Sequence, residues 1–270
     1  MPRRMWVDFL LALAGIVMLF PFGWMAFVSL RPAGEVIVQL RDWTWRWEWS
    51  NYARVWQMLP LPKYFANTLL ISVMSTVVGT AMAIGAAFAF TSFAFYGRKL
   101  AISLMIFTLF IPPDLMLIPN YITIARFGYI DSYTGIMLPL LLNAFTIFYL
   151  LQSFAAIPQE YRLVAQAEGC SPFVYLTRIV IPVTAQPIGA LMLLKMIGVW
   201  NDYLWPLIIT NSAEKRTLAV GLLAFGNEAG TNYQLLMTVS MYVVLPITIL
   251  YFIMRKHILL ALPRTHQFKS

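Results

Sequence analysis

The chain has 270 residues, of which 60% are hydrophobic and only 11% charged, and its mean hydropathy is +0.74. Ordinary soluble domains carry about 25% charged residues, so this composition excludes a soluble globular protein and indicates a membrane protein. The net charge of +8 then fits membrane topology and anionic headgroups better than nucleic acid. The single cysteine, Cys170, excludes an internal disulfide.

Long apolar segments recur along the whole chain. Because a helix needs about 20 apolar residues to cross a bilayer, we expect six transmembrane helices, at about 7–30, 64–93, 100–122, 133–154, 183–210 and 233–254. The predicted fold is an all-α integral membrane protein, with residues 1–270 in one transmembrane domain. An even number of spans places both termini on one side. Clusters of basic residues in the tails and short loops assign that side to the cytoplasm.

The first helix follows Arg3 and Arg4, as a secretory signal would. Its apolar run is too long for a signal peptide and no cleavage pattern follows it, so we expect an uncleaved span. The next loop has Trp43, Trp45, Trp47 and Trp49 alternating with polar residues. Alternation allows a short strand, but an interfacial segment with its indoles at headgroup depth is the favoured interpretation.

The second and third helices each carry a distinctive pattern. The second is rich in small residues between Gly79 and Ala89, which let helix backbones approach closely in lipid. The third contains Pro112 and Pro113 followed by Asp114. Prolines remove helix hydrogen bonds, so we expect a break there. An acid at such a break is costly in lipid and is expected to face protein, water or the interface.

Residues 156–182 form a polar interruption between apolar segments. Pro158 predicts the start of a short helix, and Gly169 predicts its end in a left-handed conformation. Ser171 and Pro172 then have the character of an N-cap and first residue of a second helix. The segment is therefore predicted to be a helix-turn-helix unit on the cytoplasmic face.

The fifth helix carries the most polar chemistry inside the membrane. Lys195 and Asp202 are seven residues apart and are expected to share a helix face. Trp200 and Asn201 precede Asp202. Two interpretations stay open: Lys195 is a structural partner of Asp202 or Asp114, or these side chains face a transported solute.

Several kinds of chemistry are absent from the sequence. There is no Gly-x-x-x-x-Gly-Lys-Ser/Thr loop to cradle the phosphates of ATP. The two histidines, His257 and His266, lie at the C-terminal end and make no metal site with Cys170 or catalytic triad within a span. We therefore expect no metal, no cofactor and no catalytic residue in this chain, which leaves a conduit or a scaffold.

The polar interruption resembles the EAA coupling loop of permease subunits of type I ATP-binding-cassette importers. Gly169 matches the motif glycine, Ala165 its second alanine and Pro182 its closing proline. Residues beside this motif and elsewhere in the chain resemble the carbohydrate (maltose-type) branch of the family. They are Pro158, Glu160, Glu168, Arg178, the Phe65–Thr68 run, Pro112, Pro113, the Trp200–Asp202 run and Pro206. The resemblance covers nearly the whole chain.

One position departs from the motif. Leu163 stands where the family has its glutamate, and Val164 stands where it has its first alanine. Leucine cannot pair with a basic residue of an ATPase. Either Glu160 or Arg162 substitutes for that glutamate, or this subunit docks mainly through apolar contact.

The resemblance implies a prokaryotic inner-membrane permease subunit that moves a solute, most simply a sugar or sugar-like compound, without being an enzyme itself. ATP and Mg²⁺ would act on a partner ATPase dimer, with a second permease and an extracytoplasmic solute-binding protein completing the importer. The implied ATPase-coupling residues are Glu160, Arg162, Leu163, Ala165, Glu168, Gly169 and Pro182. The candidate solute-path residues are Asn67, Asp114, Lys195, Trp200, Asn201 and Asp202.

Two other classes remain as alternatives. An ion-coupled secondary transporter acting as an oligomer would use Asp114, Lys195 and Asp202, although such proteins usually show internal repeats and none is evident here. A receptor or assembly scaffold would carry no solute. The sequence does not indicate which solute is carried.

Overall fold

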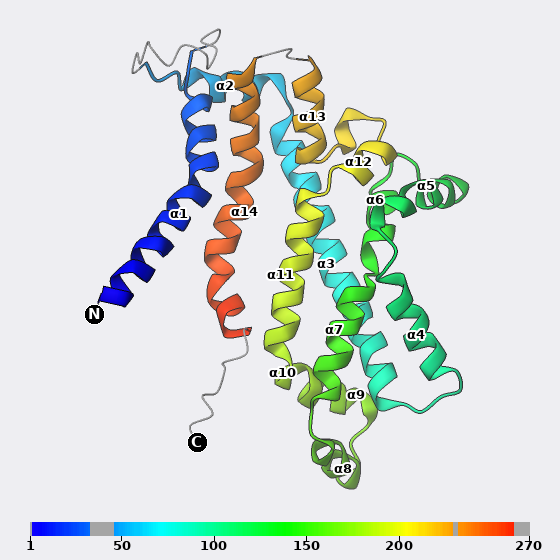
Figure 1. Cartoon of the computed structure of the whole chain (residues 1–270). Helices are drawn as coiled ribbons and strands as arrows, with labels where there is room; N and C mark the ends of the chain where they lie inside the picture. The colour runs from blue at the N-terminus through cyan, green and yellow to red at the C-terminus, as the bar shows by residue number, and fades with distance from the viewer. Residues whose placement is uncertain (1, 33–45, 229–231, 262–270) are drawn as a thin grey trace. The chain divides into compact units, whose positions relative to one another are not determined.

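The computed structural model describes residues 2–32, 46–228 and 232–261, and within them it contains helices and connections but no strand (Figure 1). The predicted all-α membrane class is confirmed. The contacts divide the chain into two compact units, one of Met1–Phe65 with Leu218–Ile249 and one of Ala66–Thr217 with Leu250–Ser270. The single transmembrane domain expected for residues 1–270 stays a prediction.

The first unit is held together by polar contacts at the end of its N-terminal helix. It contains α1 (Pro2–Ser29), α2 (Ser50–Met58), the start of α3 (Leu61–Ser92), α13 (Leu218–Glu228) and most of α14 (Tyr233–Ala261). The buried Asn51 amide donates to the carbonyls of Ser29 (3.0 Å) and Arg31 (2.9 Å). Thr238 of α14 donates to the same Ser29 carbonyl at 3.1 Å. These bonds satisfy carbonyls that the end of α1 leaves free.

The second unit contains the remainder of α3 and the helices that carry the candidate site. They are α4 (Arg98–Thr108), η1 (Pro113–Met116), α5 (Leu117–Arg126), α6 (Tyr133–Leu141), α7 (Ala144–Ala155), α8 (Gln159–Ala167), α9 (Pro172–Tyr175), η2 (Leu176–Val180), α10 (Ile181–Val183), α11 (Ala185–Asn201), α12 (Leu204–Ile209) and η3 (Ala213–Lys215). Within this unit, α8 lies at one end and α5 and α12 lie towards the other (Figure 1).

Two apolar clusters form the core of the second unit. Near the α8 end, Ala83 and Ala87 of α3 pack with Leu150 of α7 and with Ile188 and Leu191 of α11. Near the other end, Ile71 packs with Ile124, Ile136, Trp205 and Ile209. The small residues of α3 therefore meet two neighbouring helices, as expected for close packing in lipid.

Three of the predicted spans are broken helix pairs. The break at Pro112 and Pro113 was expected, and it turns the chain by 103° between α4 and the following η1–α5 segment. The breaks of 42° between α6 and α7 and of 78° before α11 were not predicted. At the first of these, Asn143 has extended backbone and its side chain accepts from the N–H of Thr146, which starts a new helix.

The number of spans is not settled by helix length. Within the described residues, two helical stretches are long and apolar enough to cross a membrane, Trp6–Ser29 and Leu61–Ser92, or up to five spans if each bent pair counts as one. Tyr233–Ile249 is a shorter apolar helix. The count of six therefore stays a prediction.

Two helices and one loop complete the comparison with the expected elements. The amphipathic α2 and the short α13 were not predicted, because both are shorter than a span. Trp43 and Trp45 lie outside the described residues. Residues 46–49 form no strand, and Trp47 and Trp49 are exposed, which agrees with the interfacial interpretation.

Candidate functional site

Helices α8 and α9 form a turn with defined ends. Gly169 has φ of +70°, so the chain leaves α8 in the left-handed region that glycine adopts without strain. The N–H of Cys170 bonds to the carbonyl of Ala165 (2.9 Å) and that of Gly169 to Gln166 (3.0 Å), which is a Schellman motif. The Ser171 hydroxyl then accepts from the N–H of Val174 and begins α9. Local signals in the sequence therefore set the end of α8 and the start of α9.

The predicted coupling residues differ in exposure. Ala165 is buried, whereas Glu160, Glu168, Gly169 and Pro182 are exposed. Leu163 is 62% exposed and the adjacent Val164 is 61% exposed, which is unusual for large apolar side chains on a helix of otherwise polar character. Phe173 of α9 is 72% exposed. We call Leu163, Val164 and Phe173 the apolar docking patch.

Arg162 points inward rather than outward. Its guanidinium donates to the carbonyl of Ser92, the last residue of α3. A pocket of about 420 Å³ lies beside this bond and is lined by residues that include Arg98, Gln159, Arg162 and Tyr175. Burial raises the pKa of Tyr175, so its phenol stays protonated at neutral pH. Through its bond to the Ser92 carbonyl, Arg162 anchors α8 to the end of α3.

Lys195 lies where three helices meet. Its ammonium donates to the Leu141 carbonyl at 2.6 Å, at the C-terminal end of α6. A Cβ placed on Gly79 of α3 would lie 2.0 Å from the Lys195 nitrogen and 2.2 Å from the Leu141 oxygen, so only glycine fits there. The ammonium thus satisfies a carbonyl left free by the helix break, where its charge also complements the helix dipole.

The helix face that Lys195 and Asp202 were expected to share is interrupted. Helix α11 ends at Asn201, and Asp202 has extended backbone, so the two side chains do not share a helix face. Helix α12 begins two residues later, at Leu204. Trp200 is buried and Asn201 is exposed, with its amide donating to the Ile197 carbonyl at 3.0 Å.

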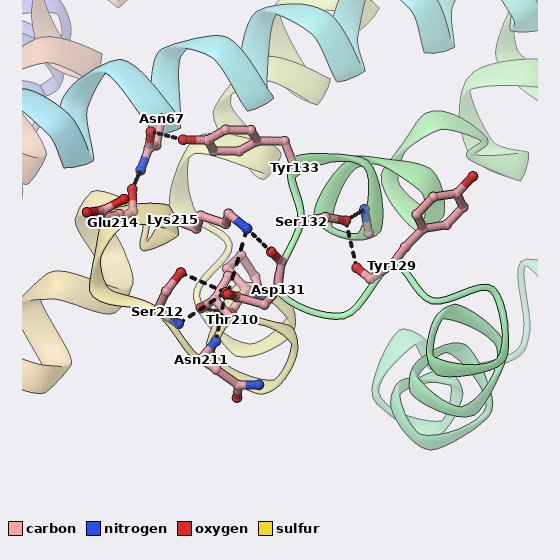
Figure 2. A network of polar contacts seen from close by, with 12 residues as sticks. Asn67, Tyr129, Asp131, Ser132, Tyr133, Thr210, Asn211, Ser212, Glu214 and Lys215 are labelled. Atoms are coloured by element: carbon pink, nitrogen blue, oxygen red, sulfur yellow. Dashed lines mark hydrogen bonds and ion pairs between the residues drawn. The ribbon is translucent and has the colours of Figure 1, made fainter.

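The two remaining solute-path candidates lie elsewhere. Asp114 is exposed in η1 after the proline break. Asn67 is only 3% exposed, and its amide nitrogen donates to the carbonyls of Glu214 (2.7 Å) and Arg216 (2.9 Å) while its oxygen accepts from Tyr133 (2.8 Å). Its polar atoms are therefore occupied in holding the loop after α12 (Figure 2).

A second clasp holds the same loop and was not found from the sequence. Figure 2 shows Asp131 facing that loop, where its Oδ1 accepts from the N–H groups of Asn211 (3.0 Å) and Ser212 (3.1 Å) and from the Ser212 hydroxyl (2.9 Å). Lys215 lies 3.7 Å from Oδ2. The Ser212 N–H is the main reason that the pKa of Asp131 lies below its ordinary value. No linear pattern connects residues 80 positions apart.

Comparison with known proteins decides the family. Residues 77–260 match the family described as the binding-protein-dependent transport system inner membrane component. The chain belongs to that family. This inner membrane component is 29% identical over 195 residues to the arabinooligosaccharides transport system permease protein AraQ of Bacillus subtilis (strain 168), covering 72% of the chain and 69% of AraQ.

Two further proteins are similar to this permease. It is 30% identical over 202 residues to the sn-glycerol-3-phosphate transport system permease protein UgpE of Brucella abortus (strain 2308), covering 72% of each protein. A chain from the crystal structure of a bacterial ABC transporter involved in import of the acidic polysaccharide alginate superposes with a TM-score of 0.82 at 21% identity, over 93% of this chain and 95% of that one. That structure supports the fold.

Family membership settles the class of function. The chain is a membrane-spanning permease subunit of a binding-protein-dependent importer and a non-catalytic component of it, so the resemblance stated from the sequence is confirmed. The ion-coupled secondary transporter is not favoured. Among the side chains that the structure describes, no group of three or more His, Cys, Asp or Glu lies close enough to hold a metal ion.

Proposed function

We propose that this permease carries a sugar or sugar-like solute across the prokaryotic cell (inner) membrane, driven by ATP hydrolysis on separate subunits. The names of AraQ and UgpE, an oligosaccharide and a sugar-alcohol phosphate system, support this class of solute. Both termini and the α8–α9 unit would lie in the cytoplasm. The partners would be a second permease, an ATPase dimer that binds ATP and Mg²⁺, and an extracytoplasmic solute-binding protein.

The α8–α9 unit carries the coupling part of the proposal. It contains Ala165, Gly169 and Pro182 at the positions of the family motif, and α8 ends in a Schellman motif at Gly169. Movement of the ATPase at this unit would pass into α3 through the Arg162 bond to Ser92. ATP binding and hydrolysis would then bias the bundle between inward-facing and outward-facing states, because the ATPase contacts the two states differently.

We propose that the apolar docking patch makes the main contact with the ATPase. Leu163 replaces the motif glutamate, and Arg162 is turned towards α3, so neither supplies an outward charge. Large apolar side chains exposed on a short helix gain free energy when a partner covers them, about 1.5–3 kcal/mol for a fully buried leucine. Glu160 and Glu168 lie exposed on the same unit and would form the polar rim.

Leu163→Asp and Val164→Asp test this assignment. Each change places a carboxylate where the ATPase would bury an apolar group, and 1.4 kcal/mol corresponds to a tenfold change in affinity. We expect each variant to recover about tenfold less ATPase than the parent chain when the tagged permease is purified from membranes. Phe127→Asp is the matched control, since Phe127 is 66% exposed at the end of α5, which lies towards the other end of the second compact unit (Figure 1), and it should recover the parental amount.

Deletion of residues 160–169 tests whether the whole α8–α9 unit is needed to recover the ATPase. An inserted deletion variant that still recovers its ATPase would show that the α8–α9 unit is not the coupling element. Normal recovery by both aspartate variants, with loss in the deletion, would instead retain the unit and reject the apolar patch.

A further inference from the structure

Four hydroxyl groups lie buried along one face of α3. Ser72, Ser75, Thr76 and Thr80 follow the three- and four-residue spacing of a single helix face, and each is at most 3% exposed. Their side-chain oxygens have no hydrogen-bond partner among the residues that the structure describes. We call these four residues the hydroxyl seam.

Several other hydroxyls of this chain bond to the backbone one turn earlier. Thr91, Thr184, Thr210 and Thr248 each donate to the carbonyl four residues earlier, at 2.6–2.9 Å. That bond is the usual solution for serine and threonine in transmembrane helices. The hydroxyl seam does not use it, so its groups are directed at something other than their own backbone.

The Lys195 ammonium lies against α3 near the Thr80 end of the seam. It lies against Gly79, which is adjacent to Thr80 and one turn from Ser75 and Thr76. Within the described part of the chain its one hydrogen bond goes to the Leu141 carbonyl, and Asp202 lies beyond the end of α11. A lysine inside a bundle usually has a charged partner or faces a solute path, and no carboxylate of the described residues pairs with this one.

We propose that the hydroxyl seam and Lys195 form a solute-binding site inside the membrane for an acidic sugar. This inference rests on the proposed function and names its solute class. Serine and threonine hydroxyls both donate to and accept from sugar hydroxyls, and the ammonium binds the anionic group, a carboxylate or a phosphate. In this structure the seam is closed and Lys195 holds the Leu141 carbonyl. Opening of the bundle would exchange that carbonyl for the anion of the solute.

Cysteine labelling of the complete importer tests the site. Thr76→Cys and Thr80→Cys are made with Cys170→Ser, which removes the only native cysteine. Val77→Cys, 50% exposed on another face of α3, is the matched control. The complex in proteoliposomes with ATP, Mg²⁺ and binding protein is treated with an anionic sulfonate or a cationic trimethylammonium methanethiosulfonate reagent of similar size.

Both seam cysteines should react at least tenfold faster than Val77→Cys. Relative to the rates of the two reagents with a free thiol in solution, they should also react about tenfold faster with the anionic than with the cationic reagent. Lys195→Gln should bring that ratio close to one, whereas Lys195→Arg should preserve it. Because the ratio is taken within each variant, differences in yield cancel. A seam that stays unreactive in a complex that hydrolyses ATP would overturn the site and show a closed structural feature. A complex without an ATPase would instead reject the proposed function.

Protection by added sugars tests the solute class. Glucuronate and glucose 1-phosphate, as carboxylate and phosphate probes, are compared with glucose at equal concentration. At least one anionic sugar should slow labelling of Thr80→Cys several-fold while glucose does not, and the more effective probe identifies the anionic group. Equal protection by glucose would overturn the anionic selection, and labelling that none of the three sugars slows would show a water-filled seam instead of a solute site.

Discussion

Gly79 is the residue on which the meeting of α3, α6 and α11 depends. Its missing side chain leaves the space that the Lys195 ammonium and the Leu141 carbonyl occupy. The carbonyl belongs to the backbone and cannot move without moving α6, whereas the lysine side chain can be displaced. A methyl group at this position would therefore force the two helices apart and expel the ammonium from the carbonyl.

Gly79→Ala is accordingly expected to destabilise the protein by about 1–3 kcal/mol, the usual cost of overpacking. The thermal midpoint of the detergent-solubilised protein should fall by several degrees. Gly85→Ala is the matched control, since nothing lies within 4 Å of a Cβ there and alanine favours a helix. Its midpoint should stay equal or rise slightly. Equal midpoints for Gly79→Ala and the parent would contradict the contact.

The loop that follows α12 is held by side chains from distant helices. Asp131 has φ of +54° and directs its carboxylate at the N–H groups of Asn211 and Ser212, and Asn67 binds the same loop from α3. An ionised acceptor makes a stronger hydrogen bond to N–H than a neutral one. The conformation of residues 210–216 therefore depends on the charge of Asp131.

Hydrogen exchange at the Asn211 and Ser212 amides measures this dependence. The pKa of Asp131 is lowered in the folded protein, so protection is complete above its ordinary value of 3.8 and is lost as pH falls through the lower folded value. Asp131→Asn keeps the left-handed backbone and loses the charge, so it should exchange faster at neutral pH. Asp131→Ala should exchange faster still. Exchange at the parental rate in both variants would rule out the clasp.

How much of each element was predictable depends on where its signal lies. Pro158 and Gly169 predict where α8 starts and ends, and Ser171 predicts where α9 starts. These residues act on their immediate backbone neighbours, so the sequence alone was enough to predict these boundaries. The carbonyl at the break after Leu141 is satisfied by Lys195, 54 residues away. Helix α11 ends where Asp202 takes up extended backbone. The sequence around both breaks is apolar throughout, so it predicts one continuous helix. A uniformly apolar segment has no change in pattern that would mark an interruption.

The same reasoning explains the candidate site. A seven-residue spacing predicted that Lys195 and Asp202 share a face, but the spacing holds only while the helix continues, and α11 stops at Asn201. Asn67 was found as part of a family-like run, while its structural partners lie about 150 residues later. The hydroxyl seam was overlooked because serine and threonine are common in transmembrane helices, and only their missing partners distinguish these four.

The whole molecule is one subunit of a larger machine. The chain has no phosphate-binding loop, and it belongs to a family of inner membrane components that depend on a binding protein. Its α8–α9 unit lies at one end of the second compact unit, with the Asp131 and Asn67 clasps towards the other. The proposed coupling surface and the clasped loop at opposite ends suit the proposed permease, which would respond to an ATPase on one side and to a solute-binding protein on the other.

The subunit composition of the purified importer tests the central claim most directly. The tagged chain would be purified from the membranes of its own host, and native mass spectrometry would give the stoichiometry while ATP hydrolysis is measured on the same sample. We predict one copy of this chain with one second permease and two copies of an ATPase, and hydrolysis that rises when the solute-binding protein is added. A preparation containing only this chain, with no associated ATPase and with solute transport in the absence of ATP, would contradict the account.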